Sequence, residues 1–98
     1  MKEITPSELK TLINSKADFQ LIDVREEYEF EEVNINGILI PMGEALERST
    51  EISKDIQVVI HCRSGKRSAT VISALENQQG YTNLYNLQGG ILAYLEEG

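Results

Sequence analysis

One stretch of the chain decides the fold, and it reads Val58-Val59-Ile60-His61-Cys62-Arg63-Ser64-Gly65-Lys66-Arg67-Ser68-Ala69. Its β-branched residues predict a buried strand that ends at Cys62, the only cysteine of the chain. A short loop with a glycine at its centre follows, and a helix is predicted to begin at Ser68. In open α/β sheets ligands bind where the strands end, so we expect the chemistry at this loop.

Composition and charge narrow the class of protein. The chain has 98 residues, 41% of them hydrophobic and 26% charged, which predicts a single globular domain over residues 1–98. A net charge of −7 argues against a nucleic-acid partner. No apolar run approaches the ~18 residues that span a bilayer, so we expect no membrane association. A single cysteine cannot form an internal disulfide, and this favours a cytoplasmic location.

Hydrophobic periodicity and turn residues predict alternating strands and helices. In the first helix, Thr5 and Glu8 form a capping box, and Gly80 is expected to end the longest helix. We predict helices over residues 5–14, 26–32, 43–49, 68–79 and 91–96, and strands over 19–25, 38–40, 57–60 and 83–85. This alternation is typical of an α/β protein with a mostly parallel sheet of four or five strands and helices on both faces, with residues 57–60 at the centre.

The loop favours an ionised thiol at Cys62. A backbone that curls around Gly65 turns successive N–H groups inward, and the following helix presents the positive end of its dipole. Arg63, Lys66 and Arg67 add full positive charges nearby. These effects predict a pKa below the usual value of about 8.5 and a thiolate competent as a nucleophile. The alternatives are an inert buried cysteine and a basic cluster that is merely solvated; the polar residues around Cys62 disfavour the first.

His61 precedes the cysteine and could suggest a Cys/His catalytic pair. Adjacent residues of a strand point to opposite faces, however, so we expect His61 to be a packed residue.

Four motifs give the chain a resemblance to the rhodanese family, and together they extend over almost its whole length. The Asp-Val-Arg-Glu run begins at Asp23, a glycine at Gly37 precedes Ile40-Pro41, and the loop from Cys62 to Ser68 resembles the family's Cys-x-x-Gly-x-Arg-Ser loop. The fourth motif, Asn86-Leu87-Gln88-Gly89-Gly90-Ile91, resembles the family's late Leu-x-Gly-Gly signature.

The resemblance implies a rhodanese-like fold and sulfurtransferase chemistry without a metal or cofactor. Cys62 would take a sulfane sulfur from a small anionic donor such as thiosulfate and hold it as a persulfide. A second nucleophile would then accept that sulfur. Asp23 and Arg25, at neighbouring strand ends, would support the site, and Arg67 would also tie the loop to its scaffold. The implied substrate-binding residues are Arg63, Ser64, Gly65, Lys66, Arg67 and Ser68.

Two other classes stay open on the sequence. A dual-specificity phosphatase or arsenate reductase of the same fold needs a Cys-x5-Arg loop, whereas here four residues separate Cys62 from Arg67. A non-catalytic binding module is the other alternative. If the chain is an enzyme, its single cysteine cannot resolve a persulfide through an internal disulfide. The acceptor must then be external: cyanide, a thiol or a sulfur-carrier protein.

Overall fold

Five parallel strands form one sheet in the computed structural model, which describes residues 1–97. The sheet order is β1-β5-β4-β2-β3, so β4 lies at the centre, between β5 and β2. The strands are β1 (Lys2–Ile4), β2 (Phe19–Asp23), β3 (Ile38–Leu39), β4 (Gln57–His61) and β5 (Leu84–Leu87). The predicted parallel sheet and its central strand are therefore confirmed.

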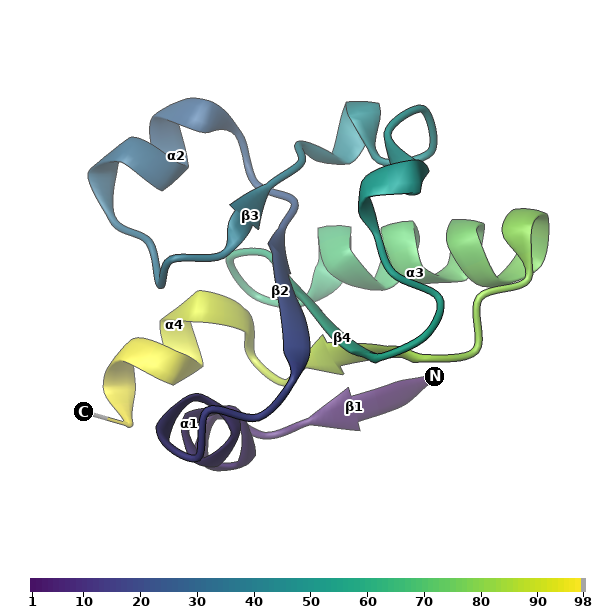
Figure 1. Cartoon of the computed structure of the whole chain (residues 1–98). Helices are drawn as coiled ribbons and strands as arrows, with labels where there is room; N and C mark the ends of the chain where they lie inside the picture. The colour runs from purple at the N-terminus through teal and green to yellow at the C-terminus, as the bar shows by residue number, and fades with distance from the viewer. Residues whose placement is uncertain (98) are drawn as a thin grey trace.

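Helices cover both faces of this sheet, as predicted (Figure 1). On one face α3 packs against alternate residues of β4, so that Ile60 and Leu75 share a core cluster. On the other face Val59 packs with Leu9 of α1 and with Tyr94 of α4. The helices are α1 (Pro6–Asn14), α2 (Glu27–Glu32), α3 (Lys66–Gln79) and α4 (Gly90–Glu96).

Local signals place the ends of two helices correctly. The Thr5 hydroxyl accepts a hydrogen bond from the Glu8 N–H at 3.1 Å, and the Glu8 carboxylate accepts one from the Thr5 N–H at 2.9 Å. Gly80 ends α3 with a φ of 69°, a left-handed conformation that glycine adopts without strain. The start of α3 was predicted two residues too late, because Gly65 takes the capping position with a φ of 110°.

Two predictions of secondary structure are wrong. The predicted helix over residues 43–49 is instead a pair of short 3-10 helices, η1 (Met42–Glu44) and η2 (Ser49–Glu51). Gly43 and the Ser49-Thr50 pair are weak helix formers, and Leu46 is 39% exposed and adds little to the core. The strand β1 was missed because its three residues owe their conformation to pairing with β5, whose partner residues lie 83 residues further along the chain.

Within residues 1–97, none of the helices has the length and apolar character required to cross a bilayer.

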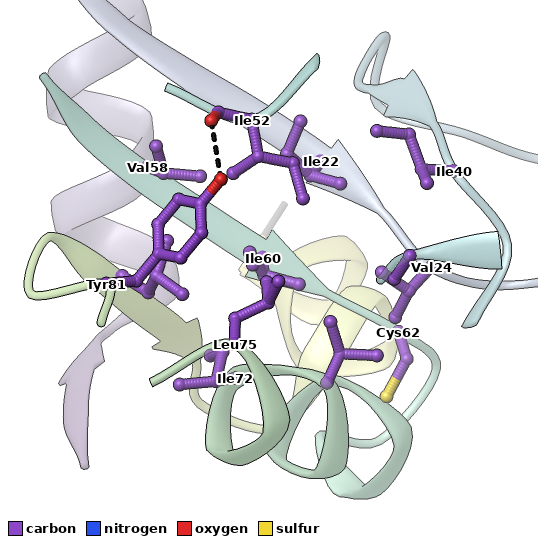
Figure 2. Packing of buried hydrophobic residues seen from close by; sticks show 13 residues of the cluster. Ile22, Val24, Ile40, Ile52, Val58, Ile60, Cys62, Ile72, Leu75 and Tyr81 are labelled. Carbon is purple, nitrogen blue, oxygen red and sulfur yellow. Dashed lines mark hydrogen bonds between the residues drawn. The ribbon is translucent and has the colours of Figure 1, made fainter. Parts of the chain in front are cut away.

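The packed cluster under α3 ends at Cys62. Figure 2 shows Cys62 beside Val24 at the edge of the cluster, with Tyr81 at the opposite end, where its hydroxyl donates to the Ile52 carbonyl at 2.9 Å. The first residues of α4 close over the backbone that follows. The Ile91 N–H donates to the Cys62 carbonyl at 2.9 Å, and the Leu92 N–H donates to the Arg63 carbonyl at 3.2 Å.

Close approach at this junction requires a glycine at position 90. A Cβ added to Gly90 would lie 2.3 Å from the Arg63 carbonyl oxygen, and its φ of 62° is unfavourable for other residues. We predict that Gly90→Ala lowers the free energy of unfolding by at least about 2 kcal/mol, because strain and a backbone clash add together. Urea denaturation measures this loss. Gly43→Ala is the control, since an added Cβ there meets nothing within 4 Å; equal effects of the two substitutions would contradict the prediction.

Candidate active site

The loop after β4 encloses the sulfur of Cys62 with backbone N–H groups. The Gly65 N–H donates to Cys62 Sγ at 3.1 Å, and the Ser68 N–H donates to it at 3.4 Å. The φ of 110° at Gly65 is what turns the chain back toward the sulfur. The predicted inward-facing cradle of amides is present.

Exposure differs sharply along this loop. Cys62 is only 1% exposed, whereas Arg63, Ser64 and Lys66 are exposed on the surface around it. The sequence disfavoured an inert, buried cysteine because the neighbours of Cys62 are polar, and the expected exposure of the sulfur is wrong. The loop backbone encloses the sulfur, while the side chains of Arg63, Ser64 and Lys66 stay in solvent. The amides nevertheless face the sulfur, so burial here does not make the thiol an apolar core residue.

Hydrogen bonding controls the ionisation of this thiol. Burial alone raises the pKa of Cys62, because it disfavours the charged thiolate. The contact with the Ser68 side chain, whose Oγ lies 3.4 Å from Sγ, and hydrogen bonds from the amides of Ser68, Gly65 and Ser64 outweigh burial, and the pKa of Cys62 is lowered overall. The predicted direction is confirmed, although the loop's own donors, rather than its cationic side chains, are the main favourable cause.

Asn86 of β5 holds the two residues whose amides face the sulfur. Its side-chain oxygen accepts a hydrogen bond from the Ser68 hydroxyl at 2.6 Å, and its amide nitrogen donates to the Gly65 carbonyl at 3.1 Å. Asn86 is 5% exposed and Ser68 fully buried, so both polar groups depend on these contacts. In the sequence Asn86 stood out only as part of the fourth motif, and its role in holding the loop was not predicted. Its position near the carboxyl end of a strand was the signal that could have indicated this role.

Arg67 fastens the loop to α2. Its guanidinium donates to both carboxylate oxygens of Glu29, at 2.7 and 2.9 Å. The bidentate pair lowers the pKa of Glu29 to about 2, chiefly through the Arg67 hydrogen bonds. The implied link between Arg67 and its scaffold thus has a defined partner. No pattern in the sequence pairs Glu29 with Arg67, because 38 residues separate them.

Asp23 and Arg25 form a second, deeper ion pair at the end of β2. Arg25 Nη2 lies 2.8 Å from Asp23 Oδ2, with the side chains 3% and 0% exposed. The same nitrogen donates to the Val33 carbonyl at 2.8 Å and so holds the end of α2. The Val24 N–H between them donates to the His61 carbonyl, which connects this pair to the strand that carries Cys62.

His61 is a packed residue, as the strand alternation predicted. It is fully buried, and its Nε2 lies 3.7 Å from Asp23 Oδ2. Burial lowers the pKa of His61 and so favours the neutral ring, although the neighbouring Asp23 carboxylate acts in the opposite direction. Val59, two residues earlier on the same face, packs toward α1, whereas Cys62 belongs to the cluster under α3.

The fold and the loop together define a class: a parallel α/β domain with a thiolate-stabilising loop at the end of its central strand. The model of the rhodanese-like domain matches residues 5–97, and the chain belongs to this family. A protein named sulfurtransferase from Allochromatium vinosum is 37% identical over 99 residues, covering 100% of this chain and 92% of that protein. A crystal structure of a rhodanese-like domain protein from Staphylococcus aureus superposes with a TM-score of 0.87 at 35% identity, covering 96% of this chain and 91% of that one.

The family also occurs within longer proteins. The probable adenylyltransferase/sulfurtransferase MoeZ of Mycobacterium tuberculosis is 35% identical over 100 residues, and the chain spans 24% of its length.

Removal of the Ser68 hydroxyl tests whether the contacts of the loop lower the pKa of the Cys62 thiol. We predict that Ser68→Ala raises the pKa of Cys62 and slows its alkylation by iodoacetamide at pH 7 about fivefold, because the sulfur loses a polar contact at 3.4 Å and Asn86, which positions the loop amides, loses the Ser68 hydroxyl. The pH profile of alkylation should move to higher pH. Ser64→Ala is the matched control, since it keeps the backbone N–H and removes an exposed hydroxyl. Superimposable profiles for the wild type and Ser68→Ala would overturn the account.

The Glu29–Arg67 pair predicts a defined pH dependence of stability. A folded-state pKa of about 2 against a usual value of 4.5 means that ionised Glu29 stabilises the fold at neutral pH. We predict that Glu29→Gln lowers the free energy of unfolding by about 1–2 kcal/mol at pH 7, since solvent reaches both side chains and weakens the pair. The difference should shrink as the pH falls from 4.5 toward 2.

Urea denaturation at several pH values measures the effect of Glu29→Gln. Glu31→Gln, which removes an exposed carboxylate from the same helix, is the control. A constant difference between wild type and Glu29→Gln across this range would show that the carboxylate charge is not the source of the stabilisation.

Proposed function

We propose that the protein is a persulfide-forming sulfurtransferase with Cys62 as its nucleophile. The observation that supports this most is the pair of N–H groups, from Gly65 and Ser68, directed at the sulfur of the only cysteine. The same groups that favour a thiolate can hold the terminal charge of a persulfide. Membership of the rhodanese-like family, and the full-length similarity to a protein named sulfurtransferase, support the same chemistry.

The donor is a small anion such as thiosulfate. The Cys62 thiolate attacks its outer sulfur, a new S–S bond forms, and the donor's S–S bond breaks with its electron pair leaving on sulfite. Charge balances, because a thiolate and a dianion give a persulfide anion and a dianion. Arg63 and Lys66 are exposed beside the loop and form no ion pair within residues 1–97, so their charge is available to the donor.

The remaining loop residues have different parts in this proposal. Ser64 and Gly65 supply N–H groups that lower the pKa of the sulfur, and Ser68 adds its N–H and a side-chain contact at 3.4 Å. Arg67 is held by Glu29, and its contribution to anion binding is therefore a charge at a fixed position. Asp23 and Arg25 support the strand end from behind.

Sulfur leaves the enzyme for an external acceptor. A nucleophile such as cyanide or a thiolate attacks the outer sulfur of the persulfide, the Cys62–S bond breaks, and the Cys62 thiolate is regenerated. The chain holds no second cysteine that could accept the sulfur by forming a disulfide.

Loss of the sulfur nucleophile is the direct test. We predict that Cys62→Ser keeps the fold, since the two side chains have nearly the same size, and abolishes thiocyanate formation from thiosulfate and cyanide. Incubation with thiosulfate should add ~32 Da, the mass of one sulfur, to the wild type and nothing to the variant.

Other outcomes of this experiment identify other functions. An unchanged mass of the wild type with every sulfane donor would favour a binding module. Hydrolysis of aryl phosphates without turnover of thiosulfate would favour a phosphatase. Cys62→Ser activity at the wild-type level would exclude Cys62 as the nucleophile.

A further inference from the structure

Exposed apolar side chains gather beside the active-site loop. Nine large apolar side chains are exposed on the surface of residues 1–97, and four of them line a single cavity of about 350 Å³. Tyr28 is the most exposed of all at 70%; the others are Val33, Leu92 and Leu95. Single exposed apolar residues are ordinary on a protein surface, but a cluster around a concavity indicates a binding site.

This cavity is continuous with the loop that holds the sulfur. It lies between α2 and α4, and Arg63, the residue after Cys62, is part of its wall. The N–H of Leu92 donates to the Arg63 carbonyl at 3.2 Å, so the α4 wall is joined directly to the loop. Figure 1 shows α2 above and α4 below on the left of the view, and each follows the carboxyl end of a strand, β2 and β5 respectively. Below, we call this cavity the α2–α4 groove.

The α2 side of the groove has an acidic rim, with Glu32 in the lining, whereas Arg63 gives the loop side of the lining a positive charge. The carboxylates of Glu26, Glu27, Glu31 and Glu32 on or next to α2 are exposed, and none forms an ion pair within the described chain. Two further lining charges, Arg25 and Glu29, are neutralised by Asp23 and Arg67. Basic side chains on a partner would complement this rim.

We propose that the α2–α4 groove docks a sulfur-accepting protein that inserts an apolar side chain and carries basic residues facing α2. The proposal rests on the proposed function, because it assigns the acceptor of the persulfide. Cyanide or a small thiol gains no binding energy from an apolar groove with an acidic rim. A protein acceptor does, because it must hold its thiol near Cys62 during the transfer. In the step itself, the partner's thiolate attacks the outer sulfur of the persulfide. The Cys62–S bond breaks, the partner becomes the persulfide, and Cys62 leaves as a thiolate.

Synthetic cysteine peptides can stand for the unidentified partner. The first peptide carries a leucine and two lysines beside its cysteine, the second has glutamates in place of the lysines, and the third has serine in place of the leucine. Persulfide-loaded protein is mixed with each, and the loss of the added sulfur is followed by mass spectrometry. We expect the first peptide to remove the sulfur about tenfold faster than the other two. Its advantage over the acidic peptide should fall as salt is added.

Variants of the protein test whether the faster discharge by the first peptide depends on the α2–α4 groove. Leu92→Ser should slow discharge by the first peptide about five- to tenfold and leave discharge by cyanide unchanged. Leu46→Ser is the matched control, because Leu46 is a similarly exposed leucine at 39% that lies outside the α2–α4 groove. Should Leu92→Ser fail to fold, as judged by circular dichroism, Tyr28→Ser replaces it at a more exposed position. Glu32→Lys should reduce the preference for the basic peptide.

The outcomes separate the two proposals. Equal rates with all three peptides, or equal effects of Leu92→Ser and Leu46→Ser, would overturn the docking proposal. If cyanide still discharges the persulfide rapidly in that case, the proposed function is unaffected. Failure to load any persulfide would instead overturn the proposed function.

Discussion

The N–H groups that converge on Cys62 Sγ are the contacts on which the rest of the site depends. They allow a sulfur that is almost inaccessible to solvent to carry a negative charge. Without them, burial would favour the neutral thiol and the cysteine would be an ordinary core residue. Because backbone dipoles already point at the charge, little reorganisation is needed when a thiolate or a persulfide forms. The positive φ of Gly65 is the local condition for this arrangement.

Three other elements hold the loop in this conformation. Asn86 on β5 binds Gly65 and Ser68, Glu29 on α2 binds Arg67, and the first N–H groups of α4 bind the carbonyls that follow β4. Each of these elements lies at the carboxyl edge of the parallel sheet, where successive strand ends meet. The α2–α4 groove is a consequence of the same arrangement. The two helices that support the loop also border the space through which a partner would approach.

Prediction from the sequence succeeded wherever the signal was contiguous. The buried strand, the glycine, the cations and the helix all lie within twelve residues, and this was enough to predict the loop around Cys62 and the lowered pKa of its thiol. The capping box at Thr5 succeeded for the same reason, since both partners lie within one helical turn. Prediction failed for β1, which is a strand only because β5 supplies hydrogen-bond partners. It also failed for residues 43–49, where a short segment follows the surface of the core instead of its own weak helical pattern.

The sequence by itself determined the class of fold, the loop that holds the cysteine we propose as the nucleophile, and the absence of a second cysteine for an internal disulfide, because these follow from periodicity, loop composition and the count of one cysteine. Only the tertiary structure decided which residues support the nucleophile and how far it is buried. Glu29 and Asn86 lie 38 and 18 residues from their partners Arg67 and Ser68. Contacts at that separation depend on strand order and helix packing, which arise when the whole chain closes around its core and leave no local pattern to read.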